Sequence, residues 1–167
     1  MKVYITSGTF TYLLNMVKEH PAEQLLLLHN NQSTLLLQET DRSTLFKVPR
    51  KYDSIVQSGQ LKQEGFVVLY HVPVNSESQP VFEHEYKKNL KKIEGQSGLI
   101  AYRFLKPLGS DSYIILTQWQ EESAFKAWQS SASYISVNDL KLPQASAQKM
   151  FTGDPFLSKY SAPTIDE

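Results

Sequence analysis

The sequence predicts an α+β protein of two related ferredoxin-like halves, with antiparallel sheets covered by helices. Short apolar runs typical of strands are separated by apolar residues at helical spacing. Each half follows the order strand, helix, strand, strand, short helix. STLLLQETDRSTLF and SYIILTQWQEESAF are also faintly alike. This likeness fits either a duplication that forms an internal pseudo-dimer or a chance similarity between short apolar strands, and the sheets are expected to pack together or to merge.

Residues 1–62 are predicted to form the N-terminal half. KVYITS alternates apolar and polar side chains, which is typical of a strand. The helix that follows has apolar residues at i, i+3, i+4 and i+7 from Phe10, and Pro21 ends it. EQLLLLHN and STLLLQET are predicted to pair as a hairpin around Asn-Asn-Gln. RSTLFKV is predicted as a third short strand, and Pro49 as the first turn of a small helix running through Tyr52, Ile55 and Val56.

Residues 63–167 are predicted to form the C-terminal half. GFVVLYHV is a strand that Pro73 interrupts. A helix then begins near Val81, with apolar residues at helical spacing on one side and lysines on the other. LIAYRFLKP and SYIILTQW are predicted to pair as strands around a turn at Gly109. The next helix carries Trp128 on its apolar face, and PFLSKYSAP is predicted as a last edge strand.

The composition excludes several functional classes. Lys and Arg total 17, and Asp and Glu also total 17, which argues against nucleic acid or an anionic membrane as the main partner. The absence of cysteine excludes disulfides, thiolate metal sites and cysteine nucleophiles. No P-loop, G-x-G-x-x-G or G-x-S-x-G motif is present, and no two histidines are spaced as a helical metal pair. The N-terminus does not look like a signal peptide, and no apolar run would span a bilayer, so we expect a cytoplasmic protein.

Aromatic side chains are the remaining candidates for a site. Tyr70, Tyr86 and Trp128 come from a strand and two helices that a ferredoxin-like unit would place over one sheet face. A cavity lined by these rings, with the lysine-rich run YKKNLKK at its rim, would suit a flat apolar ligand with acidic groups at its edge. The alternative is that the aromatic residues fill an ordinary core and that the lysines form a solvated helix face.

One known family resembles most of this chain up to Tyr134. The resemblance is carried by FEHEYKKNLKKIEGQSGLIAYRFLKPLGSDSYIILTQWQEESAFKAWQSSASY, and by KVYITSGTF, LLLLHNN and LLLQETDRSTLFKVP in the first half. These segments resemble the Isd-type haem-degrading monooxygenases of the longer HmoB-like branch. They also resemble the TRAP-like proteins, which share the architecture of two halves. The resemblance implies the dimeric α/β-barrel type of ferredoxin-like fold found in antibiotic biosynthesis monooxygenase (ABM) domains.

The resemblance also assigns roles to individual residues. Trp128 matches a tryptophan that lies against the haem and helps to distort it. Tyr70 stands where the family has an asparagine near the iron-bound oxygen, and Asn138 stands where it has the histidine that binds iron. No histidine follows His84. Because tyrosinate is a known haem-iron ligand, Tyr86 is the tentative iron ligand, and Tyr70 would ligate the iron or donate a hydrogen bond to bound dioxygen.

Further residues receive secondary roles. Phe125 is expected to contact the haem beside Trp128. Lys87 is expected to meet the haem propionates, and Lys88 and Lys91 are further candidates. His71 is expected to point to the opposite sheet face and to pack between the halves. Trp119 is expected to be structural.

The expected function is haem degradation by a monooxygenase. Haem would be both substrate and cofactor, dioxygen would be consumed, and an external reductant would act as the electron donor. The protein is expected to be a monomer, because its halves would pair internally. The alternatives are a non-catalytic haem-binding protein, a TRAP-like stress or interaction protein, and a cofactor-free monooxygenase acting on a small aromatic molecule.

Overall fold

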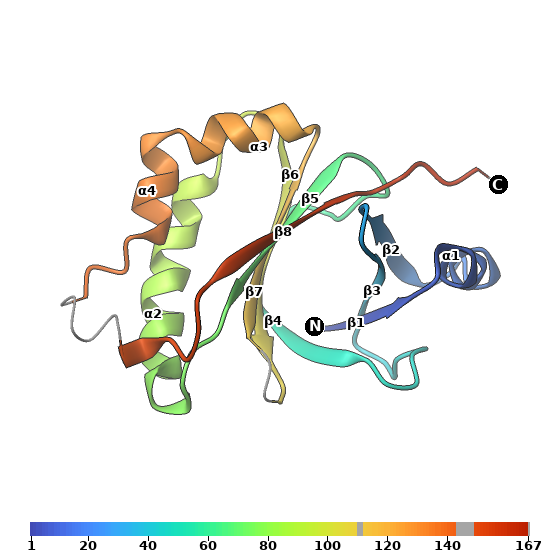
Figure 1. The fold of residues 1–167 in the computed structure, drawn as a ribbon, viewed down its shortest axis with the longest axis horizontal. Helices are drawn as coiled ribbons and strands as arrows, with labels where there is room; N and C mark the ends of the chain where they lie inside the picture. The colour runs from blue at the N-terminus through green and yellow to red at the C-terminus, as the bar shows by residue number, and fades with distance from the viewer. Residues whose placement is uncertain (110–111, 143–148, 167) are drawn as a thin grey trace.

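Eight strands form one closed, antiparallel barrel in the computed structural model, which describes all residues except 110–111, 143–148 and 167 (Figure 1). The strands are β1 (Lys2–Gly8), β2 (Gln24–His29), β3 (Thr34–Thr40), β4 (Arg50–Ser58), β5 (Phe66–Val72), β6 (Leu99–Pro107), β7 (Tyr113–Trp119) and β8 (Phe156–Ser161). The helices are α1 (Phe10–Glu19), α2 (Gln79–Leu90), α3 (Glu122–Gln129) and α4 (Ala132–Asn138), with short 3-10 turns η1 (Ser76–Ser78) and η2 (Lys91–Ile93).

The strand order shows two ferredoxin-like halves joined into one barrel. Around the barrel the order is β4-β1-β3-β2 in one half and β8-β5-β7-β6 in the other. Each half thus places its fourth strand beside its first, then its third and second, which is the ferredoxin-like arrangement. The fold class predicted from the sequence is confirmed. The boundary at residue 62 stays a prediction.

The two seams between the halves differ in extent. On one side β4 pairs with β6 from Tyr52↔Pro107 to Ser58↔Tyr102. On the other side β2 and β8 share the single register pair His29↔Ser161. Gln63 supports this shorter seam, because its side-chain amide exchanges hydrogen bonds with the Leu27 backbone and donates another to the carbonyl of Pro163.

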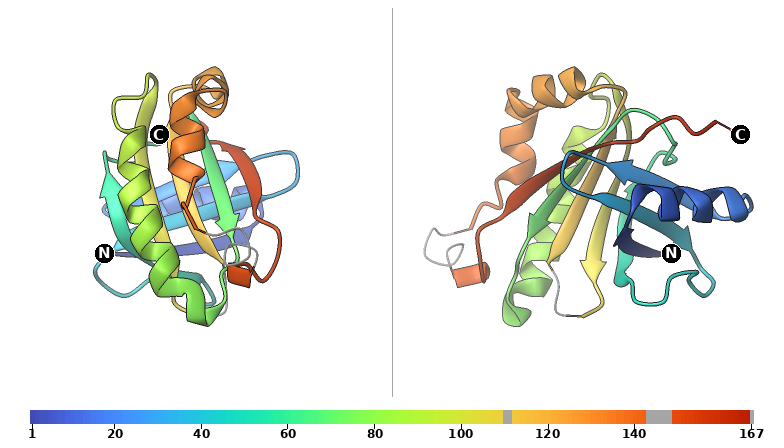
Figure 2. Two further views of the ribbon diagram at one scale, coloured as in Figure 1. Left: turned by 90° about the vertical axis from the view of Figure 1, so that its left-hand side faces the viewer. Right: turned by 45° about the vertical axis from the view of Figure 1, so that its right-hand side comes forward.

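Alternation along each strand divides the core into a barrel interior and outer layers. Val67 and Leu69 of β5 face the apolar barrel interior, whereas Val68 and Tyr70 face the helices of the C-terminal half. Figure 2 shows α2 and α4 side by side over that half, with α3 at one end. On the N-terminal half, α1 covers part of the outer face around the buried Leu13.

The predicted elements between residues 42 and 56 are wrong. Residues 42–48 contain no strand, because side chains satisfy their backbone: the Gln38 Oε1 atom accepts from the Leu45 amide. Phe46 is buried here against the sheet, in the layer where the other half has a second helix. The predicted helix from Pro49 to Val56 is instead most of strand β4.

The bulge in β4 explains this error. The register of β4 against β6 shifts between Ser54 and Val56. A bulge adds a residue and interrupts the two-residue alternation, so the apolar side chains in this strand are spaced like those of a helix.

Strand β8 also differs from its prediction as an edge strand. It lies between β5 and β2, and pairs with β5 from Phe66↔Ser161 to His71↔Phe156. The predicted turn at Gly109 continues into residues 110–111, which lie outside the described part of the chain. Among the described residues, we find no helix with the length and apolar character needed to span a membrane.

Candidate functional site

A small cavity lies between the outer sheet face of the C-terminal half and its helices. Strands β5, β7 and β8 form its floor, and α2, α3 and α4 form its walls. Its lining residues are Val68, Tyr70, Tyr86, Ile115, Thr117, Phe125, Trp128, Tyr134, Asn138 and Leu157. Its free volume is about 20 Å³, enough for one water molecule, whereas ligand pockets span roughly 300–1,000 Å³. The cavity is therefore too small for such a ligand in this structure.

Most of the predicted site residues meet at this cavity. Tyr70, Tyr86, Phe125, Trp128 and Asn138 all line it, although they come from β5, α2, α3 and α4. Their convergence follows from the ferredoxin-like topology, which places these helices over the face of β5 that carries Tyr70. The arrangement of the residues agrees with the sequence prediction, whereas their chemical roles stay predictions.

Tyr86 and Asn138 are hydrogen-bonded to each other. The Tyr86 hydroxyl donates to the Asn138 Oδ1 atom at 3.0 Å, and the Asn138 amide donates to the Tyr134 carbonyl at 2.9 Å. Burial raises the pKa of Tyr86 well above its usual value, and the nearby phenols of Tyr70 and Tyr134 raise it further. Tyr86 is therefore a neutral phenol at neutral pH, and its hydroxyl donates its hydrogen bond to Asn138.

Trp128 is packed among aromatic rings and is 4% exposed. Its ring lies 5.4 Å from that of Trp119 and 4.8 Å from that of Tyr134, with Tyr134 approaching edge-on. Its indole N–H donates to the Ser133 hydroxyl at 3.2 Å. Trp119 is fully buried and donates to the Thr117 hydroxyl at 2.9 Å. Both tryptophans thus belong to one aromatic layer, and Trp128 alone lines the cavity.

A glycine fixes the helix that carries Trp128. Gly98 has a φ of +81°, and a Cβ atom there would lie 2.5 Å from the Cβ of Ala124. The Gly98 carbonyl accepts from the Gln120 amide at 2.8 Å, just before α3. A larger residue at position 98 would push α3 away from the sheet.

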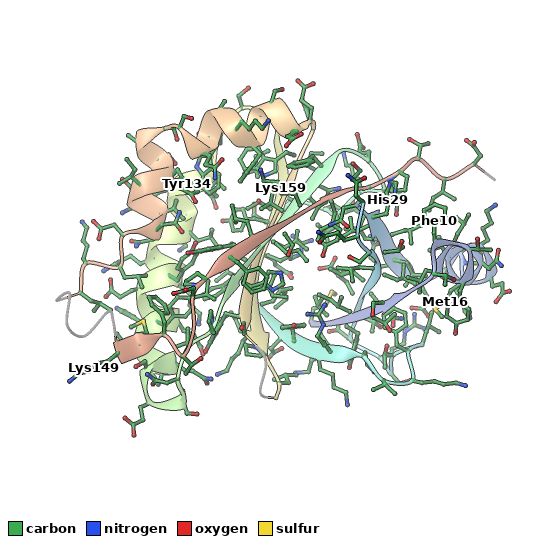
Figure 3. The ribbon with its side chains drawn as sticks, viewed as in Figure 1. Phe10, Met16, His29, Tyr134, Lys149 and Lys159 are labelled. Atoms are coloured by element: carbon green, nitrogen blue, oxygen red, sulfur yellow. The ribbon has the colours of Figure 1, made fainter. Side chains whose placement is uncertain are left out.

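Two further tyrosines shape the polar part of the cavity. Burial raises the pKa of Tyr70, and Tyr134 raises it further. Neither the Tyr70 nor the Tyr134 hydroxyl has a hydrogen-bond partner within the described residues. Figure 3 labels Tyr134 on α4, where it faces the sheet. Both hydroxyls are therefore able to donate a hydrogen bond to a ligand.

No lysine is among the residues that line the cavity. Lys87 is exposed on α2 and does not line the cavity. Lys88 pairs with Glu85 at 3.1 Å on the same exposed surface. Lys159 of β8, labelled in Figure 3, lies instead 5.6 Å from the centre of the Phe125 ring.

His71 lies on the other side of β5, as predicted. Its Nε2 atom is 3.2 Å from the Ser158 hydroxyl, and its ring stacks on Phe156 at 4.4 Å. Burial and, to a smaller extent, the nearby positive charge of Arg50 lower the pKa of His71 to about 4. His71 therefore does not contribute to the cavity. The part of the chain that the structure describes contains no cluster of three or more His, Asp or Glu side chains suited to a metal ion.

Sequence reasoning missed part of the lining. The residues it did not single out for the site are Val68, Ile115, Thr117, Tyr134 and Leu157. Tyr134 could not be assigned to the same helix face as Trp128 from residue spacing, because a break at Ser130–Ser131 separates α3 from α4. The one available signal was Ser131, whose hydroxyl accepts from the Tyr134 amide and begins α4.

The C-terminal half has a known domain type. Residues 65–139 match the family described as antibiotic biosynthesis monooxygenase, or ABM. This range runs from the residue before β5 to the residue after α4, and so includes every lining element except β8. The C-terminal half therefore contains a segment that is similar to ABM domains.

The chain is also similar to particular proteins. A haem-degrading monooxygenase of Listeria monocytogenes is 28% identical over 130 residues, which are 78% of each chain. The signal transduction protein TRAP of Staphylococcus aureus is 24% identical over 139 residues, 80% of each chain. A solved structure of a major regulator of staphylococcal pathogenesis matches 98% of this chain and 100% of its own, with a TM-score of 0.86 and 20% identity. The resemblance predicted from the sequence is confirmed, and the regulator structure supports the fold.

Proposed function

We propose that this protein is a haem-degrading monooxygenase and that its cavity binds haem as the substrate. The observation that carries this proposal is the convergence of Tyr70, Tyr86, Phe125, Trp128 and Asn138 on one cavity of an ABM domain. The similarity to the haem-degrading protein of Listeria monocytogenes adds support.

The lining suits the porphyrin ring better than the iron. The flat apolar faces of Phe125 and Trp128 suit a flat apolar ring. Among the residues that line the cavity there is no histidine, and the candidate oxygen ligands are phenols whose pKa is raised or an amide. The free volume of about 20 Å³ is also far too small. Haem therefore fits only after the helical wall moves, and we derive no reaction step at the iron.

The protein's own groups have defined tasks in this proposal. Trp128 and Phe125 pack against the porphyrin ring and exclude water from it. The Tyr70 and Tyr134 hydroxyls, which lack partners within the described residues, donate hydrogen bonds to the ligand. Lys159 meets an acidic group at the ring's edge. Bound haem would supply the site of oxygen activation, with dioxygen and an external reductant as co-substrates.

A non-catalytic haem-binding protein is the second candidate. One specific observation favours it: Asn138 replaces the family's histidine and is already bonded to Tyr86. A TRAP-like interaction protein is the third, favoured by the small volume of the cavity and by the similarity to TRAP.

One experiment separates these candidates. Purified protein is titrated with hemin, and the Soret band is followed; ascorbate is then added in air. The proposed function predicts a saturable Soret shift, followed by decay of the band and release of iron detectable with ferrozine. A saturable shift that persists under reductant would identify the non-catalytic binder. The absence of any saturable shift at micromolar protein would eliminate both haem functions.

A further inference from the structure

Helix α4 is the least anchored wall of the cavity. It has seven residues, and its one buried side chain is that of Val137. Ile135 on the same helix is 70% exposed. By contrast, α2 is anchored by four buried side chains, namely Phe82, Tyr86, Asn89 and Leu90. A helix this short is not stable by itself in water, so its position depends on contacts with its neighbours.

Polar contacts hold both ends of α4. At its start, the Ser133 hydroxyl donates to the Lys92 carbonyl at 3.1 Å and accepts from Trp128. At its end, the Tyr86 hydroxyl donates to Asn138, and the Asn89 side chain donates to the carbonyl of Asp139. Both of these contacts at the end of α4 come from α2, across the cavity wall.

We propose that α4 is the lid of the cavity and that the hydrogen bond between Tyr86 and Asn138 is its latch. Both residues line the cavity, so breaking this bond loosens the end of α4 beside the space a ligand needs and leaves the Asn89 contact to Asp139 as its other tie to α2. The break at Ser130–Ser131 between α3 and α4 provides the hinge. The site then opens without unfolding α2 or the sheet.

The latch gives position 138 a different task from the one implied by the family resemblance. That resemblance puts an iron-binding histidine here. In this chain, the side-chain oxygen of Asn138 accepts a hydrogen bond from the Tyr86 hydroxyl. While this bond is in place, neither group is available to bind a ligand. The inference rests on the proposed function for the identity of the ligand, and on the contacts above for the movement.

Hydrogen exchange of the ligand-free protein tests the latch directly. Backbone amides of residues 131–139 are compared in the wild type, Tyr86→Phe and Asn138→Ala. Tyr86→Phe removes one hydroxyl and keeps the ring. Because a hydrogen bond typically contributes 0.5–1.5 kcal/mol, exchange should speed up roughly 2- to 12-fold in α4, while α3 and the strands keep wild-type rates.

Tyr113→Phe is the matched control. The Tyr113 hydroxyl also donates to α2, at Glu83, and within the described residues Tyr113 does not line the cavity or bond to α4. Its loss should leave residues 131–139 at wild-type exchange rates. Unchanged exchange in both Tyr86→Phe and Asn138→Ala would overturn the latch, as would equal acceleration in the Tyr113→Phe control.

A second readout separates the latch from the proposed function. If hemin binds, its association with Tyr86→Phe should be faster by a similar factor, since a larger share of molecules has an open lid. Equal association rates in wild type and variant would overturn the lid. If hemin binds neither protein, the proposed function fails, and hydrogen exchange still decides the latch.

Discussion

The buried ion pair between Arg103 and Glu39 gives a demanding test of the barrel. It joins β6 of the C-terminal half to β3 of the N-terminal half, with the Arg103 Nε atom 2.7 Å from Glu39 Oε2. The two side chains are 6% and 7% exposed. Arg103 also donates to the carbonyls of Ser58 and Tyr102 at 2.9 and 2.8 Å. The pair is therefore shielded from water, and Arg103 donates to both the carboxylate and two backbone carbonyls.

Substitution of Arg103 by methionine should destabilise the protein strongly. It leaves the Glu39 carboxylate buried without its cation, which typically costs about 3–5 kcal/mol. Urea unfolding followed by circular dichroism measures the loss. The double variant Arg103→Met with Glu39→Leu removes both charges and should recover most of that stability, because well-packed apolar pairs often replace buried ion pairs at little cost.

A surface pair supplies the control. Lys2 lies 3.2 Å from Asp53, and both side chains are about two-fifths exposed, at 43% and 38%. Lys2→Met should cost less than about 1 kcal/mol, since solvent screens such pairs. A loss below about 1 kcal/mol for Arg103→Met, comparable to that of the Lys2 control, would refute the view that this pair is buried between joined halves.

Three further predictions concern the site and its surroundings. Asn138→His should restore a nitrogen ligand and give bound hemin a different Soret position; an unchanged spectrum would show that position 138 does not reach the iron. Trp128→Phe should slow hemin decay under ascorbate more than it weakens hemin binding, and equal losses would argue against a role in the reaction. Because burial holds the pKa of His71 at about 4 against about 6.5 unfolded, its contribution to stability is complete above pH 6.5 and falls as pH decreases to 4, by up to about 3 kcal/mol. His71→Gln should reduce this slope in urea unfolding at pH 4.5 to 7.5, and an unaltered slope would contradict it.

Much of the C-terminal half could be predicted from the sequence. Strands β5, β6 and β7 are bounded by Gly65, Gly98 and turn residues, and their apolar runs match observed bounds closely. The helical spacing around Tyr86 places α2 correctly. Local patterns were sufficient here because each element buries a single apolar face or is buried on both sides.

The failures arise where tertiary contacts decide the structure. The bulge at Ser54–Val56 depends on pairing with β6, which local sequence does not specify. β8 looks like an edge strand because its partners β2 and β5 lie far away in sequence. Likewise, Tyr134 lines the cavity only because α4 follows α3 and packs against α2. Lys159 reaches the Phe125 ring only because β8 lies beside β5.

Fluorine NMR of protein labelled with 5-fluorotryptophan tests directly whether the cavity binds a porphyrin ring. The chain has two tryptophans, and Trp128 lines the cavity whereas Trp119 lies behind it. Iron-free protoporphyrin is used as the probe, because ring binding does not need the iron ligand. Binding of the porphyrin ring in the cavity should cause a saturable shift of the Trp128 resonance, assigned with Trp128→Phe, that exceeds the shift of Trp119. Two resonances that stay in place throughout the titration would contradict a porphyrin site in this cavity.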